Sequence, residues 1–579
     1  MVTMERQHQE HPIYRPSEID DWNNGTNELY TFISDIHHQE SADLPSIEVP
    51  NFKIILPSTP SKRAISNVRR GDAIPKQTKL RRIQSSLEIA KPNTSPISSL
   101  FPDVLREIFE HGCSTTGSLV ITFDGIAVPT LVFSQVCRSW RSLILSHSSL
   151  WSSLIWGTQD EDLHVDSRFF LPAAAKRLVQ LWDLYLSRSR QALLDITLHL
   201  YEDDEAEIRE HLLNCVFEQL HRITNLELYC DDNAIPHEKE YIINAAPRLK
   251  ILKLLAPTRY DDDPPQPLRG SVTVDTSSLS ILQELSAQGN VLLEQVGISN
   301  SLQSVAYYPE NFINVDTSVA FPSSTSGFLS LLHCVPNIRE MKFDIELPTI
   351  PKNSPQHLPL HHLSKLALRM RTEGSETMDY LLGILDIPAL EKLELLFYGR
   401  SDGDRRWHWK NGAALKSVKD LVLDISSNRY GDRDRDRNMD PIHNENLRSL
   451  LLCTPALKSL DICTEWISSK TLSLLTLATL SSENVADNLC PKLEKLSLSE
   501  MYTEHVFSYQ DIISLISSRF RVREDVEGPK LSGLKEVYIR LGSENSNGVG
   551  GPKLKYIEPI RSFIEQGLQL HDAYCNFQP

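Results

Sequence analysis

Apolar residues recur along most of the chain in a short kernel, apolar-x-x-apolar-x-apolar. The alternation at its end is typical of a strand with one buried face. The copies are Ile223/Leu226/Leu228, Leu249/Leu252/Leu254, Leu282/Leu285/Ala287, Leu302/Val305/Tyr307, Ile338/Met341/Phe343, Leu363/Leu366/Leu368, Leu390/Leu393/Leu395, Val418/Leu421/Leu423, Leu457/Leu460/Ile462, Leu493/Leu496/Leu498 and Leu534/Val537/Ile539. Each copy therefore predicts a short strand, although the copy at Leu282 is also compatible with a chance match.

Proline marks the entry to several of these predicted strands. It stands two residues before the first apolar position at Pro247, Pro336, Pro388, Pro455 and Pro491. Apolar runs with helical character often precede the proline, as in residues 328–333, 380–385 and 447–452. The clearer units therefore predict a helix, a proline-marked turn and a strand.

A single unit of this kind cannot bury its own apolar face. Stacked units can, with their strands in a parallel sheet and their helices behind it. Successive copies begin 20 to 41 residues apart, whereas regular leucine-rich repeats span roughly 20–29 residues. The pattern therefore resembles leucine-rich repeats of an irregular kind, and it predicts a degenerate αβ solenoid.

Two amphipathic stretches precede the repeats, at residues 97–113 and 130–151. In the first, Val104, Leu105, Ile108 and Phe109 follow Pro102 at helical spacing, and proline suits the first turn of a helix. The second carries one apolar stripe: Leu131, Val132, Val136, Trp140, Leu143 and Ile144. We expect a long loop, at about residues 112–129, between them. Two short helices cannot bury all these side chains between themselves, so something else must cover the remainder.

The residues of these stretches carry a family resemblance. The run Ile97-Ser-Ser-Leu100-Phe-Pro102-Asp103-Val104-Leu105-Arg-Glu-Ile108-Phe109, then Ser134-Gln-Val136-Cys137-Arg138-Ser-Trp140-Arg141 and Leu150-Trp151, resembles an F-box. An F-box is a small three-helix unit that docks a SKP-type adaptor and tethers its chain to a cullin ubiquitin ligase. The alternative is an ordinary amphipathic helical hairpin with a buried tryptophan.

The resemblance implies a set of residues that either face the adaptor or form the core of the three-helix unit. These are Leu100, Pro102, Val104, Leu105, Ile108, Phe109, Val136 and Trp140. The sequence by itself does not separate the two roles.

The remaining chain completes the predicted domain plan. Residues 1–95 are a polar region expected to be disordered, and residues 96–156 are the F-box. Residues 157–220 form a helical linker with the first solenoid elements. This segment is expected to contain a helix near 169–186 and a strand at 193–200. Residues 221–545 are the repeat domain. Residues 546–579 form a capping helix, expected at about residues 557–570, and a tail. The fold class is thus a three-helix F-box followed by an irregular leucine-rich-repeat horseshoe.

Bulk composition restricts the partners and the compartment. The chain of 579 residues has a formal net charge of -17, which argues against general affinity for nucleic acid or anionic membrane. No secretory signal or uncharged apolar run of about 18–20 residues occurs. Nine scattered cysteines without a C-x-x-C pair indicate buried thiols in a reducing compartment, so we expect a cytoplasmic or nuclear protein. A basic cluster between Lys62 and Arg82 is a nuclear-import signal, a patch for an acidic partner, or a solvated tail.

Motifs for catalysis, a metal or a cofactor do not emerge from the sequence. His357, His361 and His362 lack the partners and spacing of a zinc site, and the glycine-rich run 548–553 lacks the ending of a phosphate loop. Trp407 and Trp409, among basic residues, fit a ligand-stacking patch, a protein-contact surface, or one tryptophan in the core with basic neighbours in solvent.

The leading hypothesis is therefore a substrate-recognition subunit of an SCF-type cullin ubiquitin ligase, acting in ubiquitin-dependent protein degradation. It would bind a SKP-type adaptor through the F-box and a target protein through the repeats. The alternative is a non-ligase interaction scaffold built on the solenoid. Two departures from the F-box pattern, Phe101 and the long loop, favour this alternative. An enzyme in its own right has no residue support.

Overall fold

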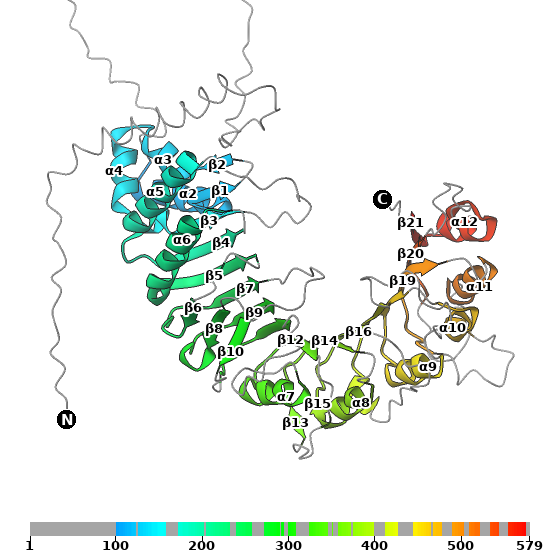
Figure 1. Ribbon diagram of the computed structural model, residues 1–579. Helices are drawn as coiled ribbons and strands as arrows, with labels where there is room; N and C mark the ends of the chain where they lie inside the picture. The colour runs from blue at the N-terminus through cyan, green and yellow to red at the C-terminus, as the bar shows by residue number, and fades with distance from the viewer. Residues whose placement is uncertain are drawn as a thin grey trace, which may run out of the picture. The chain divides into compact units, whose positions relative to one another are not determined.

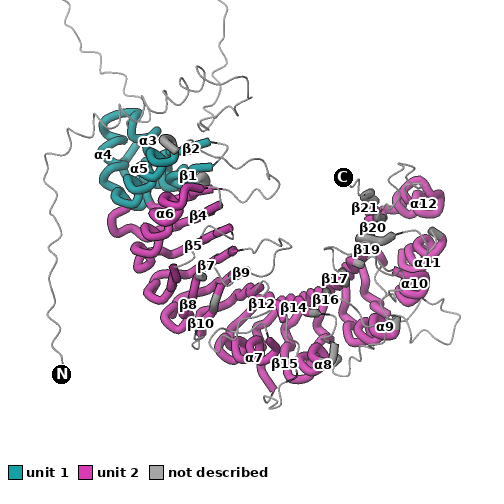
Figure 2. Tube along the Cα trace, viewed as in Figure 1, with its two compact units in different colours: residues 1–151, 160–188 teal, residues 152–159, 189–579 magenta. Residues whose placement is uncertain are grey.

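The computed structural model describes residues 100–122, 125–157, 172–201, 204–231, 235, 239–256, 271–289, 291–294, 299–308, 324–345, 350, 357–371, 375–398, 412–426, 444–464, 467–477, 489–502, 509–520, 533–542 and 554–574. Contacts divide the chain into two compact units (Figure 2). Unit 1 comprises Met1–Trp151 and Asp160–Arg188, and unit 2 comprises Ser152–Gln159 and Ser189–Pro579. Several expected features lie outside the described residues: the N-terminal region with its basic cluster, the run 548–553, and Trp407 with Trp409.

Unit 1 is mainly helical. Its elements are α2 (Pro102–Thr116), β1 (Leu119–Thr122), β2 (Gly125–Ala127), α3 (Pro129–Ser134), α4 (Arg138–Ser146), the 3-10 helix η3 (Ser148–Trp151) and α5 (Pro172–Ser189). Strands β1 and β2 form an antiparallel hairpin with Val120 opposite Ala127. The expected long loop at 112–129 is therefore wrong: α2 runs further than predicted and the hairpin occupies most of the rest.

Aromatic side chains fill the core of unit 1. Phe109 stacks on Phe133 with ring centroids 5.1 Å apart, and it meets Trp140 edge-on at 4.8 Å. Trp151 packs against Tyr185 of α5 at 4.9 Å, and the Tyr185 hydroxyl lies 2.6 Å from Thr130 Oγ1. Burial raises the pKa of Tyr185 well above its usual value, so the phenol stays protonated.

Unit 2 is built on a long parallel sheet. In spatial order its strands are β3 (Ser153–Trp156), β4 (Leu194–Leu200), β5 (Ile223–Cys230), β7 (Ile251–Ala256), β9 (Glu284–Gly289), β11 (Ser304–Tyr308), β12 (Glu340–Ile345), β14 (Lys365–Arg371), β16 (Lys392–Tyr398), β17 (Asp420–Ser426), β18 (Ser459–Thr464), β19 (Lys495–Tyr502), β20 (Glu536–Gly542) and β21 (Gln569–Tyr574). Every neighbouring pair in this order is parallel. Unit 2 is thus a large parallel sheet with helices, as the repeats predict.

The helices of unit 2 lie on one side of this sheet (Figure 1). They are α6 (Ala206–Glu218), α7 (Thr325–Cys334), α8 (Ser375–Ile384), α9 (Asn444–Cys453), α10 (Ser469–Leu475), α11 (Tyr509–Phe520) and α12 (Glu558–Glu565). Two short parallel sheets, β6 (Glu240–Ile243) with β8 (Ser271–Asp275) and β10 (Val291–Glu294), and β13 (Leu358–Pro359) with β15 (Leu385–Asp386), complete the unit. The other side of the long sheet has no helix in the described part of the chain, and we call it the helix-free face.

The kernels found in the sequence account for the strands. In every copy the three apolar side chains are at most 2% exposed, and the last two belong to one strand of the long sheet. The copy at Leu282 is no exception, since its Leu285 and Ala287 lie in β9. The strand prediction is therefore confirmed for the whole series.

Turns at the proline positions set where each strand begins. The amide of the kernel's first residue donates to the carbonyl three residues earlier, as from Leu249 to Ala246 and from Leu390 to Ile387, both at 3.1 Å. Proline then occupies the second position of the turn, where its fixed φ is favourable. The next residue of each kernel bonds to its counterpart in the preceding unit, for example Lys250 N to Thr224 O at 2.7 Å. These bonds keep the register constant although the units differ in length.

Two expectations for the segments that flank the repeats are confirmed and one is wrong. Strand β4 matches the alternating run at 193–200, and α5 matches the predicted helix near 169–186. The C-terminal capping helix is shorter than expected. It ends at Glu565, and the chain then adds β21 in parallel to β20.

In the described residues, no helix is long and apolar enough to cross a membrane.

Candidate functional site

Helix α2 of unit 1 presents three different faces. Leu105, Phe109 and Cys113 are 8%, 1% and 4% exposed and form its buried face. A second face is charged and a third is apolar but uncovered. Because a globular helix normally shows only one apolar face, the uncovered one is the feature that needs an explanation.

The uncovered face of α2 and the two residues that precede the helix carry large apolar side chains. Val104 and Ile108, four residues apart in α2, lie along one side of the helix and are 42% and 50% exposed. Leu100 and Phe101, 37% and 77% exposed, come directly before the helix, Phe101 as its N-cap. We call these four residues the apolar strip. The other exposed large apolar residues of the described chain, Val136 apart, are scattered through unit 2: Leu193, Ile242, Ile281, Ile350, Leu452 and Tyr556.

The structure separates the residues that the sequence grouped together. Leu100, Pro102, Val104, Ile108 and Val136 are exposed. By contrast, Leu105 and Phe109 are core residues, and Trp140 is partly buried against Phe109. A partner that binds this surface can therefore touch the first group directly and the second only through the shape of the helix.

Val136 does not belong to the single stripe that the sequence suggested. The predicted second helix is broken between Ser134 and Arg138 into α3 and α4, and Val136, in the turn, is 59% exposed. Arg141 fixes this turn, because its Nε donates to the carbonyl of Ser134 at 3.1 Å. The interruption changes the direction of the chain, so the helical period no longer predicts which side Val136 faces.

Phe101 is absent from the predicted set although it is the most exposed member of the apolar strip. It occupies the N-cap of α2 without a side-chain capping bond, so it contributes nothing polar to the helix start. The sequence did contain a signal for its exposure. Phe101 directly precedes the proline that starts the helix, so helical spacing does not assign it to the buried face.

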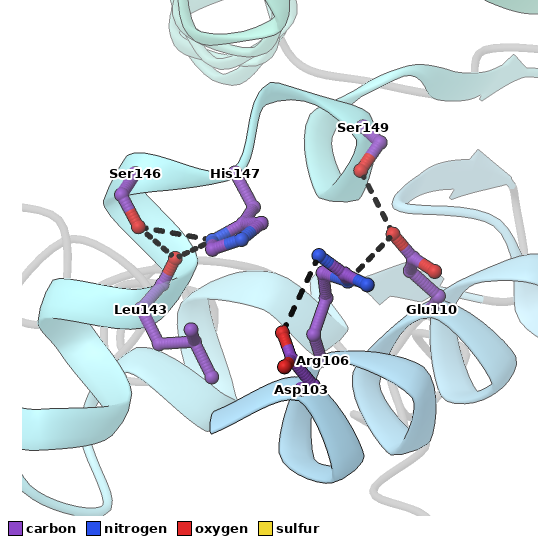
Figure 3. Close-up of polar contacts among 7 residues, drawn as sticks. All are labelled: Asp103, Arg106, Glu110, Leu143, Ser146, His147 and Ser149. Carbon is purple, nitrogen blue, oxygen red and sulfur yellow. Dashed lines mark hydrogen bonds and ion pairs between the residues drawn. The ribbon is translucent and has the colours of Figure 1, made fainter. Parts of the chain in front are cut away.

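The charged face of α2 is held by a short polar network (Figure 3). Arg106 lies between Asp103 at 3.7 Å and Glu110 at 3.9 Å, and the Ser149 hydroxyl of η3 donates to Glu110 at 3.1 Å. Exposed pairs of this kind contribute little stability each. The charged side chains pair with one another on a face of α2 other than the apolar strip, and the bond from Ser149 links η3 to α2.

Side chains cap two carbonyls at the C-terminal end of α4. His147 Nδ1 lies 2.8 Å from the carbonyl of Leu143, to which the Ser146 hydroxyl also donates at 2.8 Å (Figure 3). The Trp151 indole N–H donates to the carbonyl of Ile144 at 3.0 Å. These bonds satisfy carbonyls that the helix itself leaves open, so α4 is a rigid element beside the turn that holds Val136.

Cys137 stands next to Val136, at the N-cap of α4, and is exposed. The expectation of buried thiols is therefore wrong for this residue, and Cys215, Cys334, Cys453 and Cys463 are only partly buried. A hydrogen bond with the Ser139 hydroxyl, 3.1 Å away, lowers the pKa of Cys137, and the Trp140 amide adds to the effect. Burial instead raises the pKa of Cys113 and of Cys490 to about 12.

We expect Cys137 to react first with iodoacetamide among the described cysteines. An ordinary cysteine thiol has a pKa of about 8.5. Because the pKa of Cys137 is lowered, its thiolate fraction, and therefore its rate of alkylation, rises at a lower pH. Peptide mass spectrometry over a pH series measures this directly. Ser139→Ala should shift the rate profile of Cys137 to higher pH, and an unchanged profile would show that the hydroxyl does not stabilise the thiolate.

Comparison with known proteins adds little to this description. No family model matches the chain, and no curated protein matches it. Among solved structures, the crystal structure of a TLR13–ssRNA13 complex is similar at 16% sequence identity with a TM-score of 0.23, over 63% of this chain and 55% of that chain. This chain thus spans about half the length of that protein, and a likeness at this score carries no argument about function.

Proposed function

We propose that the chain is the substrate-recognition subunit of an SCF-type cullin ubiquitin ligase. Unit 1 is an F-box that docks a SKP-type adaptor, and unit 2 is an irregular leucine-rich-repeat domain that receives the target protein. The observation that carries the proposal is the apolar strip of α2, which lies within the residues that resemble an F-box and is left uncovered in the structure.

Three features of unit 1 support this function. The helices α2, α3 and α4 pack around Phe109, Phe133 and Trp140, so the unit is small and has its own core. Its exposed apolar side chains gather on α2 and on the turn at Val136. Exposed apolar side chains gathered in one place mark a surface for contact with another protein.

The mechanism is proximity, not chemistry at this chain. Unit 1 holds the adaptor and, through it, the cullin, while unit 2 holds the target, and a separate conjugating enzyme transfers ubiquitin. Tethering raises the effective concentration of target lysines near the charged enzyme. The subunit needs no catalytic residue, cofactor or metal for this role, and it would act in the cytoplasm or nucleus.

The test is capture of a purified SKP-type adaptor and cullin by the full-length protein. We expect the wild-type chain to retain both proteins and the double variant Val104→Asp/Ile108→Asp to retain neither. Two charges within an apolar interface should weaken adaptor binding by at least about 100-fold, since anchor residues carry about 2 kcal/mol or more each. Binding should also protect Cys137 from alkylation, because it lies next to Val136.

A matched control is Leu452→Asp, which makes the same change at a 57% exposed leucine on α9 of unit 2. It should leave capture unchanged. If a folded Val104→Asp/Ile108→Asp variant still retains the adaptor, or if the wild-type chain retains nothing, the docking role of the strip is refuted. Retention of the adaptor without cullin would instead support a non-ligase scaffold.

A further inference from the structure

The helix-free face of unit 2 is hollowed at its first strands. A depression of about 220 Å³ is lined by side chains of two adjacent rungs of β3, β4, β5 and β7. One rung is Ser153, Asp195, Asn225 and Ile251, and the other is Ile155, Thr197, Glu227 and Lys253. The volume is below the roughly 300–1,000 Å³ of sites for drug-sized molecules, so it suits a single side chain of a binding partner.

Two carboxylates face this hollow from neighbouring strands. On Asp195, the described hydrogen bonds from Thr224 and Asn225 both reach Oδ1, so in the described part of the chain Oδ2 retains its capacity to accept. His199 and, after it, Lys253 hold the pKa of Glu227 below its usual value, although burial opposes them. Glu227 is therefore anionic at neutral pH, and Lys253 is the one cation among the described residues that line the hollow.

A buried histidine lies beside Glu227, on the next rung of the same face. His199 is 3% exposed, and neither of its ring nitrogens has a hydrogen-bond partner among the described residues. Its Nε2 is 3.9 Å from Glu227 Oε1, and Tyr229 covers the ring at a centroid distance of 5.5 Å. Polar groups buried without bonds cost stability and call for an explanation. Here the ring lies close enough to the Glu227 carboxylate to stabilise its negative charge.

Gly157 is required for this arrangement. Its φ is +84°, and a Cβ there would lie 2.6 Å from His199 Cβ and 2.8 Å from the His199 carbonyl oxygen. Only glycine tolerates both the conformation and the approach. The chain therefore folds tightly against His199 at the end of β3, which fixes the position of the ring beside Glu227.

Lys253 is a replaceable counterion. Its Nζ lies 3.5 Å from Glu227 Oε2, the long limit of a hydrogen bond, and its side chain is 39% exposed. A lysine so placed can swing its ammonium into solvent at small cost. An incoming cation can then take its position at Oε2 and reach Asp195 as well, while Ile155 and Ile251 pack against the methylene groups of its stem.

We propose that this hollow binds an arginine side chain from a protein segment that lies along the helix-free face. A guanidinium is planar and presents several donors in a fixed fork, which suits two carboxylates on adjacent strands better than a compact ammonium does. The charge of the chain, -17 overall, favours the approach of a basic segment. The inference concerns unit 2 alone and does not depend on adaptor binding by unit 1.

The probe is the blocked peptide acetyl-Gly-Ser-Gly-Arg-Gly-Ser-Gly-amide, titrated with full-length protein and followed by ligand-observed NMR. Its citrulline counterpart has the same shape without the charge. We expect the arginine peptide to bind at least about tenfold more tightly than the citrulline peptide. Asp195→Asn and Glu227→Gln should each reduce arginine binding by a similar factor, and Lys253→Met should strengthen it several-fold because the competing cation is gone.

The control is Asp420→Asn, which neutralises a carboxylate on the same face at β17, outside the hollow, and should leave binding unchanged. The gain expected for Lys253→Met distinguishes a ligand site from a structural cluster, since loss of a structural ion pair would only weaken the protein. Equal binding of the arginine and citrulline peptides, no binding by wild type, or a loss caused by Asp420→Asn instead of Asp195→Asn would each overturn the proposal. Adaptor capture is measured separately, so either proposal can fail without the other.

Discussion

Replacing Phe109 by alanine is expected to destabilise unit 1 by about 3–5 kcal/mol, as for large-to-small changes of buried aromatic residues. Phe109 is 1% exposed and contacts the rings of Phe133 and Trp140. It therefore connects α2 with both α3 and α4. Alanine would leave a cavity where these helices meet, and the neighbouring rings cannot fill it without leaving their own positions.

The neighbouring residue provides the control. Ile108 is 50% exposed, so Ile108→Ala should change stability by no more than about 0.5 kcal/mol. Because a chain of two units need not unfold in one step, the measurement is hydrogen exchange of peptides from residues 100–151. Phe109→Ala should abolish slow exchange in α2, and equal protection in the two variants would contradict the assignment of core and surface.

Replacing Arg519 by alanine is expected to destabilise unit 2 by at least about 3 kcal/mol. Arg519 lies on α11, is 2% exposed, and donates to the carbonyls of Leu475, Cys490 at 3.0 Å and Leu489 at 2.8 Å. Each carbonyl left buried without a donor costs about 1–3 kcal/mol. Burial lowers the pKa of Arg519 to about 10, so the guanidinium is still charged at neutral pH.

The role of Arg519 is to fix a strained approach to β19. Cys490 has a φ of +50°, unusual for a residue other than glycine, and it opens the proline turn that starts the strand. The bond from Arg519 stabilises this conformation. Chemical denaturation monitored by hydrogen exchange in residues 489–542 tests the expectation. Arg561→Ala, which removes a 62% exposed arginine paired with Glu565, should have almost no effect, and a similarly small effect of Arg519→Ala would show that the carbonyls find other donors.

The hydrophobic pattern by itself determined the strands of unit 2. Each kernel combines an alternating apolar run with a turn that proline favours, and both are properties of a few consecutive residues. Such local signals survive the variable spacing of the units, because the register is set at the turn and not by repeat length. For that reason even the weak copy at Leu282 proved to be a strand.

The same pattern could not separate the two roles of the residues on α2. Periodicity places Val104 and Ile108 on one side of the helix and Leu105 and Phe109 on another, but both sides are apolar. Which side is buried depends on the aromatic residues of α3 and α4, which lie 20 to 40 positions further along the chain. The hydrophobic pattern did not predict the β1–β2 hairpin or the final strand β21 for a related reason. Each is short and becomes a strand only by pairing with its neighbour.

The hollow on the helix-free face was beyond sequence reasoning altogether. Asp195, Glu227 and Lys253 are about 30 residues apart in sequence, and nothing local to any of them indicates a site. Parallel stacking brings them onto adjacent rungs, and His199 becomes buried only because Gly157 and Tyr229 close around it. The sequence determined which residues form strands and helices, because that depends on neighbours along the chain. Tertiary structure decided which surfaces stay open and which charges meet, because those depend on contacts between distant segments.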